Sequence, residues 1–434
     1  MLRPLELDEI VQGGLCIGCG LCESVAGRQR VEMVSTTDGR ERPRARGPVD
    51  EPTLRAINAV CPGTRVDGAD RWRLTPGTPV DRIWGPMAQV TRAHATDPDV
   101  RYRASSGGVL SALARFLLDS GRVELIVHVA PRREAPVRTG RQLSYDRIEV
   151  LNACGSRYGP GAPLRDFLEL LDQGRPFAFI GKPCDVGAVR NLARRDPRVD
   201  RYMRYALSMI CGGASQLGKS LEVLDRFAIA ERDVSLFRYR GHGSPGAVRI
   251  ETRDGRAHEL TYAEMWEDEA TWRLQSRCKI CPDAIGEAAD IVAGDTWPGA
   301  SPPGEDAGFN SVLVRTAAGT ELLRAAVASG AITLCEPLTL TPRQLDGFNP
   351  HQVVKKRAVG VRLAARRAVG QPVPRVRRLR ITRLALSSGL RPAARELRGT
   401  LRRWRAGRLG EADVPASALG LGTMAYRERL RNGG

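Results

Sequence analysis

Two apolar runs, each followed closely by a cysteine, decide the fold: FAFIGKPC (177–184) and ALSMICGG (206–213). Apolar runs of this length are typical of buried strands. Segments with helical spacing of apolar residues, such as 109–118, alternate with them, and this alternation predicts an α/β core. Cys184 and Cys211 then stand beyond the carboxyl ends of core strands, where open α/β sheets place their ligands.

Composition predicts a globular cytoplasmic protein. The chain has 434 residues, of which 42% are hydrophobic and 27% charged, and it contains no run of about 18 apolar residues that could span a membrane. Its first ten residues, MLRPLELDEI, carry acids where a signal or transit peptide would not. Because cytoplasmic thiols stay reduced, we expect the ten cysteines to be metal ligands or free thiols.

The net charge of +18 belongs to one segment. Residues 351–410 contain 18 Lys and Arg against a single acid, Glu396, which leaves the rest of the chain close to neutral. That remainder contains no aromatic-rich RNA-binding strand, zinc finger or recognition helix, so we expect no nucleic-acid partner.

Three regions are predicted along the chain. Residues 1–75 indicate a small ferredoxin-like [4Fe–4S] domain, and a Pro/Gly linker follows them at 75–79. Residues 76–350 indicate an α/β domain. Residues 351–434 indicate a basic helical extension. We expect this extension to dock an acidic electron donor or an anionic surface, with peripheral membrane contact as a further role, and to be dispensable for cofactor binding.

The first cysteine motif is CIGCGLC (16–22), a C-x2-C-x2-C run. Thiolates at this spacing wrap one face of a cubane cluster, and a remote Cys-Pro, here Cys61-Pro62, supplies the fourth ligand. Zinc is the alternative for four thiolates, but this spacing is that of a cluster and not of a zinc finger. The predicted ligands are Cys16, Cys19, Cys22 and Cys61.

A second metal site can be assembled only by combining a cysteine motif with cysteines elsewhere in the chain. Cys278 and Cys281 form a C-x2-C pair, which is compatible with zinc, a cluster or a redox dithiol. Together with Cys184 and Cys211 they make four, yet spacing alone does not distinguish a second cluster from buried structural cysteines. Of the remaining cysteines, Cys335 lies in an apolar run and is interpreted as core, and a structural role is favoured for Cys154. The sequence indicates no catalytic residue.

The motifs, taken in order, resemble the family of coenzyme F420 hydrogenase/dehydrogenase beta subunits, which also includes 7-hydroxymethyl chlorophyll a reductase and one type of divinyl chlorophyllide reductase. The resemblance rests on CIGCGLC, YRASSGG (102–108), GSRYGP (155–160), GKPCDVGAVRNL (181–192), CGG (211–213) and CKICPDAIGEAADIVAGDTW (278–297). It implies FAD and a [4Fe–4S] cluster held by Cys184, Cys211, Cys278 and Cys281.

The flavin contacts are predicted partly from the residues and partly from the resemblance. The motif 105–108 opens a helix whose free N–H groups suit a pyrophosphate, although without the resemblance an ordinary Ser N-cap is favoured. Lys182 stands beside Cys184, where it could hold negative charge, and Asp295 follows a strand end, where a turn-forming Asp is the alternative. Ser156 and Tyr158 follow from family position only. The predicted set is Ser105, Ser106, Gly107, Gly108, Ser156, Tyr158, Lys182 and Asp295.

The expected function is that of an iron–sulfur flavoprotein oxidoreductase. Electrons would pass between a ferredoxin-like partner, two [4Fe–4S] clusters and FAD, and on to coenzyme F420 or an organic two-electron substrate such as a tetrapyrrole. The alternative is a non-catalytic electron-relay subunit of a larger dehydrogenase or hydrogenase complex. The sequence does not choose the substrate.

Overall fold

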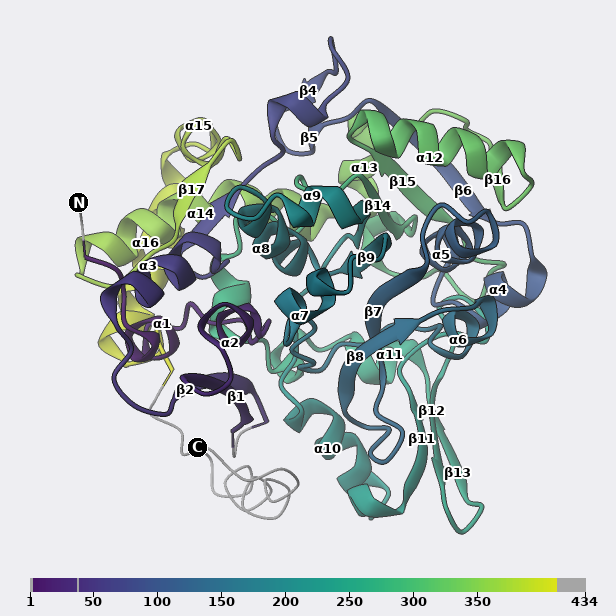
Figure 1. Ribbon diagram of the computed structural model, residues 1–434, viewed down its shortest axis with the longest axis horizontal. Coiled ribbons are helices and arrows are strands. Elements are labelled where there is room, and N and C mark those ends of the chain that lie inside the picture. Colours follow the sequence, from purple (N-terminus) through teal and green to yellow (C-terminus); the bar gives the residue numbers. More distant parts are fainter. Residues whose placement is uncertain (1–2, 37–38, 412–434) are drawn as a thin grey trace.

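The computed structural model describes residues 3–36 and 39–411 (Figure 1). The first part of the chain forms a small unit of short helices and a two-stranded antiparallel hairpin, whose strands pair Val31 with Ala45. Its elements are α1 (Leu7–Gln12), α2 (Leu21–Ala26), β1 (Val31–Ser35), β2 (Glu41–Ala45), α3 (Glu51–Val60), β3 (Arg65–Asp67) and the 3-10 helix η1 (Arg71–Arg73). The hairpin β4 (Val80–Asp81) and β5 (Gly85–Pro86) then leads into the core.

An eight-stranded mixed sheet confirms the predicted α/β core. Its order is β16-β6-β15-β14-β10-β9-β7-β8. The four strands from β14 to β7 are parallel, and antiparallel strands flank them on both sides. The strands are β6 (Gln89–Ala95), β7 (Leu125–Pro131), β8 (Thr139–Ser144), β9 (Phe177–Gly181), β10 (Met203–Met209), β14 (Ile291–Asp295), β15 (Asn310–Val314) and β16 (Ile332–Cys335).

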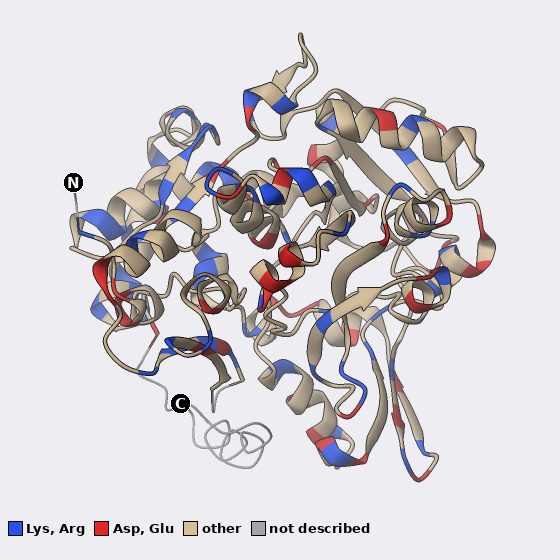
Figure 2. Ribbon diagram, in the orientation of Figure 1, with Lys and Arg blue, Asp and Glu red and all other residues tan. Residues whose placement is uncertain are grey.

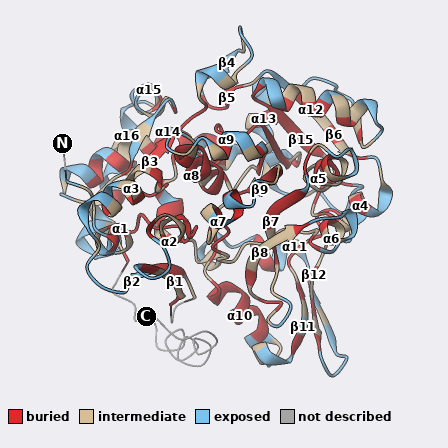
Figure 3. Ribbon diagram, viewed as in Figure 1, coloured by how far each residue is buried: buried red, intermediate tan, exposed pale blue. Residues whose placement is uncertain are grey.

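Helices cover both faces of this sheet, because successive strand residues point to opposite sides. In β9, Phe177 and Phe179 pack against Phe167 of α7 at ring distances of 5.9 and 6.3 Å, whereas Ala178 joins the core beneath α5 on the other face. Figure 3 shows the buried residues along these strands. The core helices are α4 (Pro98–Arg103), α5 (Val109–Asp119), α6 (Arg147–Asn152), α7 (Phe167–Asp172), α8 (Pro183–Ala193), α9 (Arg198–Tyr202) and α12 (Ala317–Ala328).

A second, three-stranded sheet was not predicted. Its strands β11, β12 and β13 are antiparallel and pack with α10 and α11 around a separate apolar cluster that includes Phe237 and Trp266. The elements of this region are α10 (Gly218–Arg226), η2 (Glu231–Asp233), β11 (Val234–Arg238), β12 (Val248–Thr252), β13 (Ala257–Leu260), α11 (Tyr262–Trp266), η3 (Glu269–Trp272), η4 (Ser276–Ile280) and η5 (Pro298–Ala300).

The described part of the basic segment is packed into the fold, and its dispensability for cofactor binding stays a prediction. The helix α14 buries Val359 and Leu363 against Cys16 of the N-terminal unit, and β17 pairs in parallel with β3. Charge counting misses this because part of the positive charge neutralises acids elsewhere in the chain. The elements are α13 (Pro342–Phe348), α14 (Pro350–Ala368), β17 (Arg375–Arg377), α15 (Ile381–Ser387) and α16 (Leu390–Arg405); the extension from residue 412 onward lies outside the described residues.

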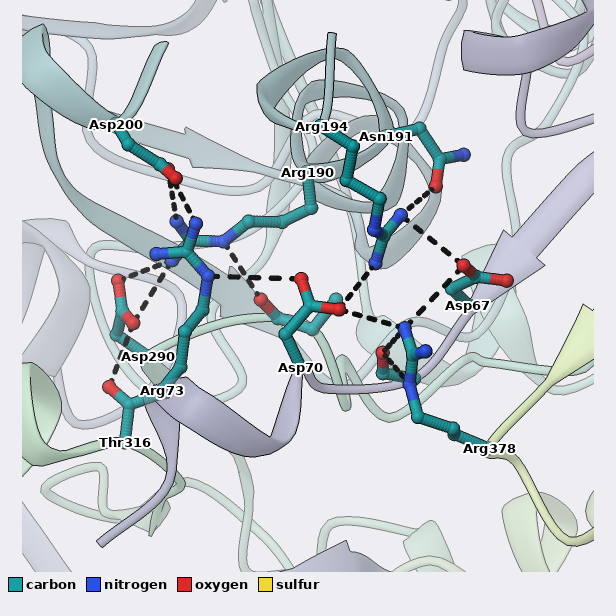
Figure 4. A network of polar contacts seen from close by, with 12 residues as sticks. Asp67, Asp70, Arg73, Arg190, Asn191, Arg194, Asp200, Asp290, Thr316 and Arg378 are labelled. Atoms are coloured by element: carbon teal, nitrogen blue, oxygen red, sulfur yellow. Dashed lines mark hydrogen bonds and ion pairs between the residues drawn. The ribbon is translucent and has the colours of Figure 1, made fainter. Parts of the chain in front are cut away.

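A network of charged side chains joins the three regions (Figure 4). Asp67 and Asp70 of the N-terminal unit both accept from Arg194 of α8 and from Arg378 after β17. In the core, Arg190 binds both oxygens of Asp290 at 3.0 and 2.9 Å. The predicted boundaries at 75/76 and 350/351 stay predictions, since contacts of this kind cross both.

The side chain of Arg366 in α14 gives a direct test of this integration. It is 1% exposed, and it donates to the carbonyl oxygens of Gly13 and Leu409 at 2.5 and 2.8 Å. Arg366→Met leaves both buried acceptors without these donors, which we expect to cost about 3 kcal/mol of unfolding free energy. The neighbouring Arg367 is exposed, so Arg367→Met should leave the thermal midpoint unchanged. Equal midpoints for the two variants would contradict the packing described here.

Candidate functional site

The carboxyl ends of three parallel strands bring predicted site residues to one edge of the central sheet. Strand pairing sets Gly181, Ser208 and Val292 level across β9, β10 and β14. Three residues further along each chain segment come Cys184, Cys211 and Asp295. Because parallel strands end at a common edge, these side chains belong to one region of the molecule.

Cys184, Cys211, Cys278 and Cys281, the second cysteine set, line one pocket with an empty volume of about 370 Å³. Cys184 begins α8, Cys211 follows β10, and the C-x2-C pair lies in and just after η4. The structure therefore brings together the four cysteines that spacing alone left open.

The pocket also contains two lysines and a backbone N–H that donates to sulfur. Lys182 forms an ion pair with Asp185 at 2.6 Å, and Lys355 of α14 lies close to the carbonyl oxygen of Gly212 at 3.4 Å. The Ala214 N–H donates to the sulfur of Cys278 at 3.3 Å. Burial raises the pKa of Cys211 to about 12, with Cys278 adding to the rise and Lys355 opposing it.

The first cysteine set, Cys16, Cys19, Cys22 and Cys61, lies at the start of α2 and the end of α3. Burial, with a smaller contribution from Cys16, raises the pKa of Cys61 to about 11. Burial likewise raises the pKa of Cys19, followed by the effects of Cys61 and Cys22. Cys61 packs in one apolar cluster with Cys16 and in another with Cys22, so these thiols lie close together.

Backbone N–H groups point at two of these sulfurs. The Gly18 N–H donates to Cys16 Sγ at 3.3 Å, and the Gly63 N–H donates to Cys61 Sγ at the same distance. Gly18 has a φ of +70°, and a Cβ there would lie 2.5 Å from the carbonyl oxygen of Glu41. Only glycine suits this position, so the loop can wrap closely around the sulfurs.

The two cysteine sets are neighbours. Ile17, which stands between two ligands of the first set, lines the pocket of the second. Arg277 lines the same pocket, is 2% exposed and donates to the carbonyl oxygen of Pro62 at 3.0 Å. The region around Ile17 and Arg277 therefore lies between the two cysteine sets.

Arg240 forms hydrogen bonds with three of the predicted flavin-binding residues. It binds both carboxylate oxygens of Asp295 at 3.2 Å, the Tyr158 hydroxyl at 3.4 Å and the Ser105 carbonyl oxygen. Its guanidinium carbon lies 4.6 Å from the ring centre of Trp297. Burial lowers the pKa of Arg240, but Asp295 outweighs that effect and the net pKa is raised.

The 105–108 motif is held largely by protein contacts. The N–H of Val109, at the start of α5, donates to Asn310 Oδ1 at 3.2 Å, and Ser106 donates to the Phe309 carbonyl oxygen at 2.8 Å. A Cβ at Gly107 would lie 2.8 Å from the Asn310 nitrogen, so this glycine allows close approach of β15. Ser105 Oγ is buried and has no hydrogen-bond partner among the described residues.

The other predicted residues lie elsewhere. Lys182 lies at the second cysteine set and not at Arg240, and Ser156 is a half-buried loop residue. Cys335 ends the edge strand β16 and is half-buried, so it is less deeply placed than its apolar run indicates. Cys154 lies 3.3 Å from the Ser111 hydroxyl, outside both sets. Sequence reasoning missed Arg240, Arg277 and Lys355, because no motif marks an arginine or lysine that reaches a site from a distant element.

The donor chemistry of both sets fits an iron–sulfur cluster. Within residues 3–36 and 39–411, no three His, Cys, Asp or Glu side chains converge closely enough to hold one metal ion. For FAD, the orphaned buried oxygen of Ser105 and the charged group of Arg240 are the matching features.

Two models of one protein family match the part of the chain that contains the central sheet. Residues 90–169 match the family model for the N-terminal part of the coenzyme F420 hydrogenase/dehydrogenase beta subunit, and residues 174–339 match the model for its C terminus. The chain belongs to this family. Family membership confirms the resemblance inferred from the motifs. The second cysteine set falls inside the matched regions, whereas the first set and Lys355 fall outside them.

Curated relatives of this chain are oxidoreductases or subunits of oxidoreductases. The coenzyme F420 hydrogenase subunit beta of Methanothermobacter thermautotrophicus is 21% identical over 67% of this chain and 99% of the relative. The F420-dependent formate dehydrogenase 1 subunit beta of Methanococcus maripaludis is 28% identical over 56% and 60%. The coenzyme F420-dependent sulfite reductase of Methanocaldococcus jannaschii is 23% identical over 79% of this chain and 51% of that protein.

A solved structure shares the fold. A chain of the F420-reducing [NiFe] hydrogenase complex from Methanosarcina barkeri aligns with a TM-score of 0.53 and 20% identity, over 68% of this chain and 98% of that one. The mixed α/β core is therefore common to both. No helix among the residues described here is long and apolar enough to cross a membrane.

The Arg240–Asp295 pair is expected to stabilise this region. Arg240→Met leaves Asp295 and the Ser105 carbonyl oxygen without their cation, which we expect to cost about 3 kcal/mol of unfolding free energy. Arg238, two residues away on β11, is the matched control because it makes no such pair among the described residues. Thermal or urea unfolding of Arg240→Met and Arg238→Met checks this, and a loss of equal size in both would contradict a special role for Arg240.

Proposed function

We propose that this protein is an iron–sulfur flavoprotein oxidoreductase with one [4Fe–4S] cluster on each cysteine set and one FAD. The observation that carries the proposal is the arrangement of eight cysteines in two adjacent groups of four, separated by Ile17 and Arg277. When bound, the clusters would exchange single electrons and FAD would collect them in pairs.

The chain's own residues prepare the second site for negative charge. Four thiolates around a cluster leave a net negative charge, and Lys182 and Lys355 both line that pocket. The Ala214 N–H donates to Cys278, which favours the thiolate over the thiol. The half-buried to buried position of all four cysteines keeps bulk water away from the sulfurs.

The flavin is proposed to bind near Arg240, Asp295 and the 105–108 motif. Asp295 stands level with Cys184 and Cys211 at the sheet edge, so a flavin held there would adjoin the second cysteine set. Ser105 Oγ offers a free hydrogen-bonding group. Ser106, Gly107, Gly108, Ser156 and Tyr158 remain proposed contacts of lower specificity, since several already bind protein atoms.

Coenzyme F420 is the proposed two-electron substrate, with a ferredoxin-like protein or a larger redox complex as the electron partner. The support is that relatives named as hydrogenase, formate dehydrogenase and sulfite reductase proteins are F420-dependent. The same names favour a second candidate, an electron-relay subunit, because two of these relatives are beta subunits. The isolated protein should oxidise reduced F420 with an artificial electron acceptor if it is catalytic, whereas a relay subunit would need its partner.

Cofactor content tests the central proposal. Protein purified without oxygen should contain about eight iron and eight sulfide per chain, together with one FAD released on denaturation. Iron, acid-labile sulfide and flavin assays measure this directly. Zinc in place of iron would refute the proposal, and about four iron would remove one of the two sites.

Single cysteine variants separate ligands from bystanders. Cys184→Ser or Cys281→Ser should lower the iron content to about four per chain and leave the paramagnetic signal of the first site intact. Cys335→Ser is the matched control, because Cys335 lies outside both sets on the edge strand β16, and it should leave both signals unchanged. Loss of a cluster in Cys335→Ser but not in Cys184→Ser would show that the second site is wrongly assigned.

A further inference from the structure

The helix α16 exposes an apolar row beside an arginine row. Leu390, Leu397 and Trp404 form the apolar row; they recur every seven residues, which is close to two helical turns, so they lie along one side. Their exposed fractions are 90%, 41% and 42%. Just around the helix from them runs the arginine row, Arg391, Arg395, Arg398, Arg402 and Arg405, all exposed.

The remaining face of α16 is committed to the protein. Thr400 is 1% exposed, and Glu396, the only acid of the helix, pairs with Arg362 of α14 at 2.8 Å. Among the described residues, no carboxylate forms an ion pair with the arginine row. Figure 2 shows Lys and Arg along this helix at the side of the molecule away from the core sheet.

We propose that α16 is a peripheral membrane-binding surface that lies on an anionic lipid bilayer. A helix with Leu and Trp on one side and arginines on the adjoining side suits the boundary between lipid head groups and acyl chains. The arginines have long apolar stems that reach upward from the boundary and place their charges at lipid phosphates.

A bilayer fits this surface better than an acidic protein does. The surface is the outer side of a helix, and Leu390 protrudes almost fully from it. A fluid anionic surface adapts to such a shape and attracts every arginine of the row alike. A protein partner would instead need carboxylates fixed opposite five positions and a groove for the apolar row.

Vesicle binding of the full chain tests the proposal. The protein should sediment with vesicles that contain phosphatidylglycerol and not with vesicles of phosphatidylcholine alone, and added salt should weaken the binding. Replacement of Arg391, Arg398 and Arg405 by Gln should weaken binding by about a hundredfold, given a contribution of about fivefold from each arginine. The matched control replaces three exposed arginines outside the C-terminal segment, Arg133, Arg232 and Arg324, by Gln. This variant should bind nearly as well as the wild type.

The apolar row has its own test. Leu390→Ser should weaken vesicle binding by about tenfold, whereas Ile148→Ser should not, although Ile148 is also an exposed helix residue, at 62%. Brominated lipid should quench the fluorescence of the wild type more than that of Trp404→Phe, because Trp404 enters the bilayer.

Three outcomes would overturn the proposal. They are no sedimentation with phosphatidylglycerol vesicles at low salt, equal losses in the two triple-arginine variants, and no difference in quenching between wild type and Trp404→Phe. If the arginine-row variant lost binding to an acidic ferredoxin while vesicle binding was absent throughout, the occupant would be a protein, and the lipid proposal would be wrong.

Discussion

A single buried carboxylate, Glu287, connects the region of the second cysteine set to α14 and to the start of α15. Its side chain is fully buried, and it pairs with Lys356 and Arg380 at 2.6 Å each. Burial raises the pKa of Glu287, but these two cations outweigh that effect and lower it overall. Because an unpaired buried charge is very costly, this loop keeps its place only while the C-terminal helices are docked on it.

The same arrangement explains how the two sites come to be neighbours. The loop that carries Glu287 follows Cys281, and α14, which supplies Lys356, also supplies Lys355 to the pocket and packs on Cys16. One helix outside the matched family regions thus touches both cysteine sets. The family core alone, residues 90–339, would not define the surroundings of either.

Sequence reasoning succeeded where the signal is local. The alternation of strands and helices gave the α/β core, and the cysteines after β9 and β10 are brought to one pocket because parallel strands share an edge. It failed where partners are distant. Arg240 reaches Asp295 across 55 residues, and Arg378 reaches Asp67 across 311, separations that neither composition nor periodicity can reveal. For the same reason, the positive charge of the C-terminal segment suggested a free tail: its acidic partners are distant in the sequence.

The packing of α14 on the first cysteine set has a consequence for biosynthesis. All four cysteines of the first set are made within the first 61 residues, yet part of their cover, α14, spans Pro350–Ala368. Domains assemble as the chain emerges from the ribosome, so these thiols remain uncovered by α14 while nearly three hundred further residues are made. The cluster proposed for this set would therefore be inserted most easily during this part of translation, before α14 docks.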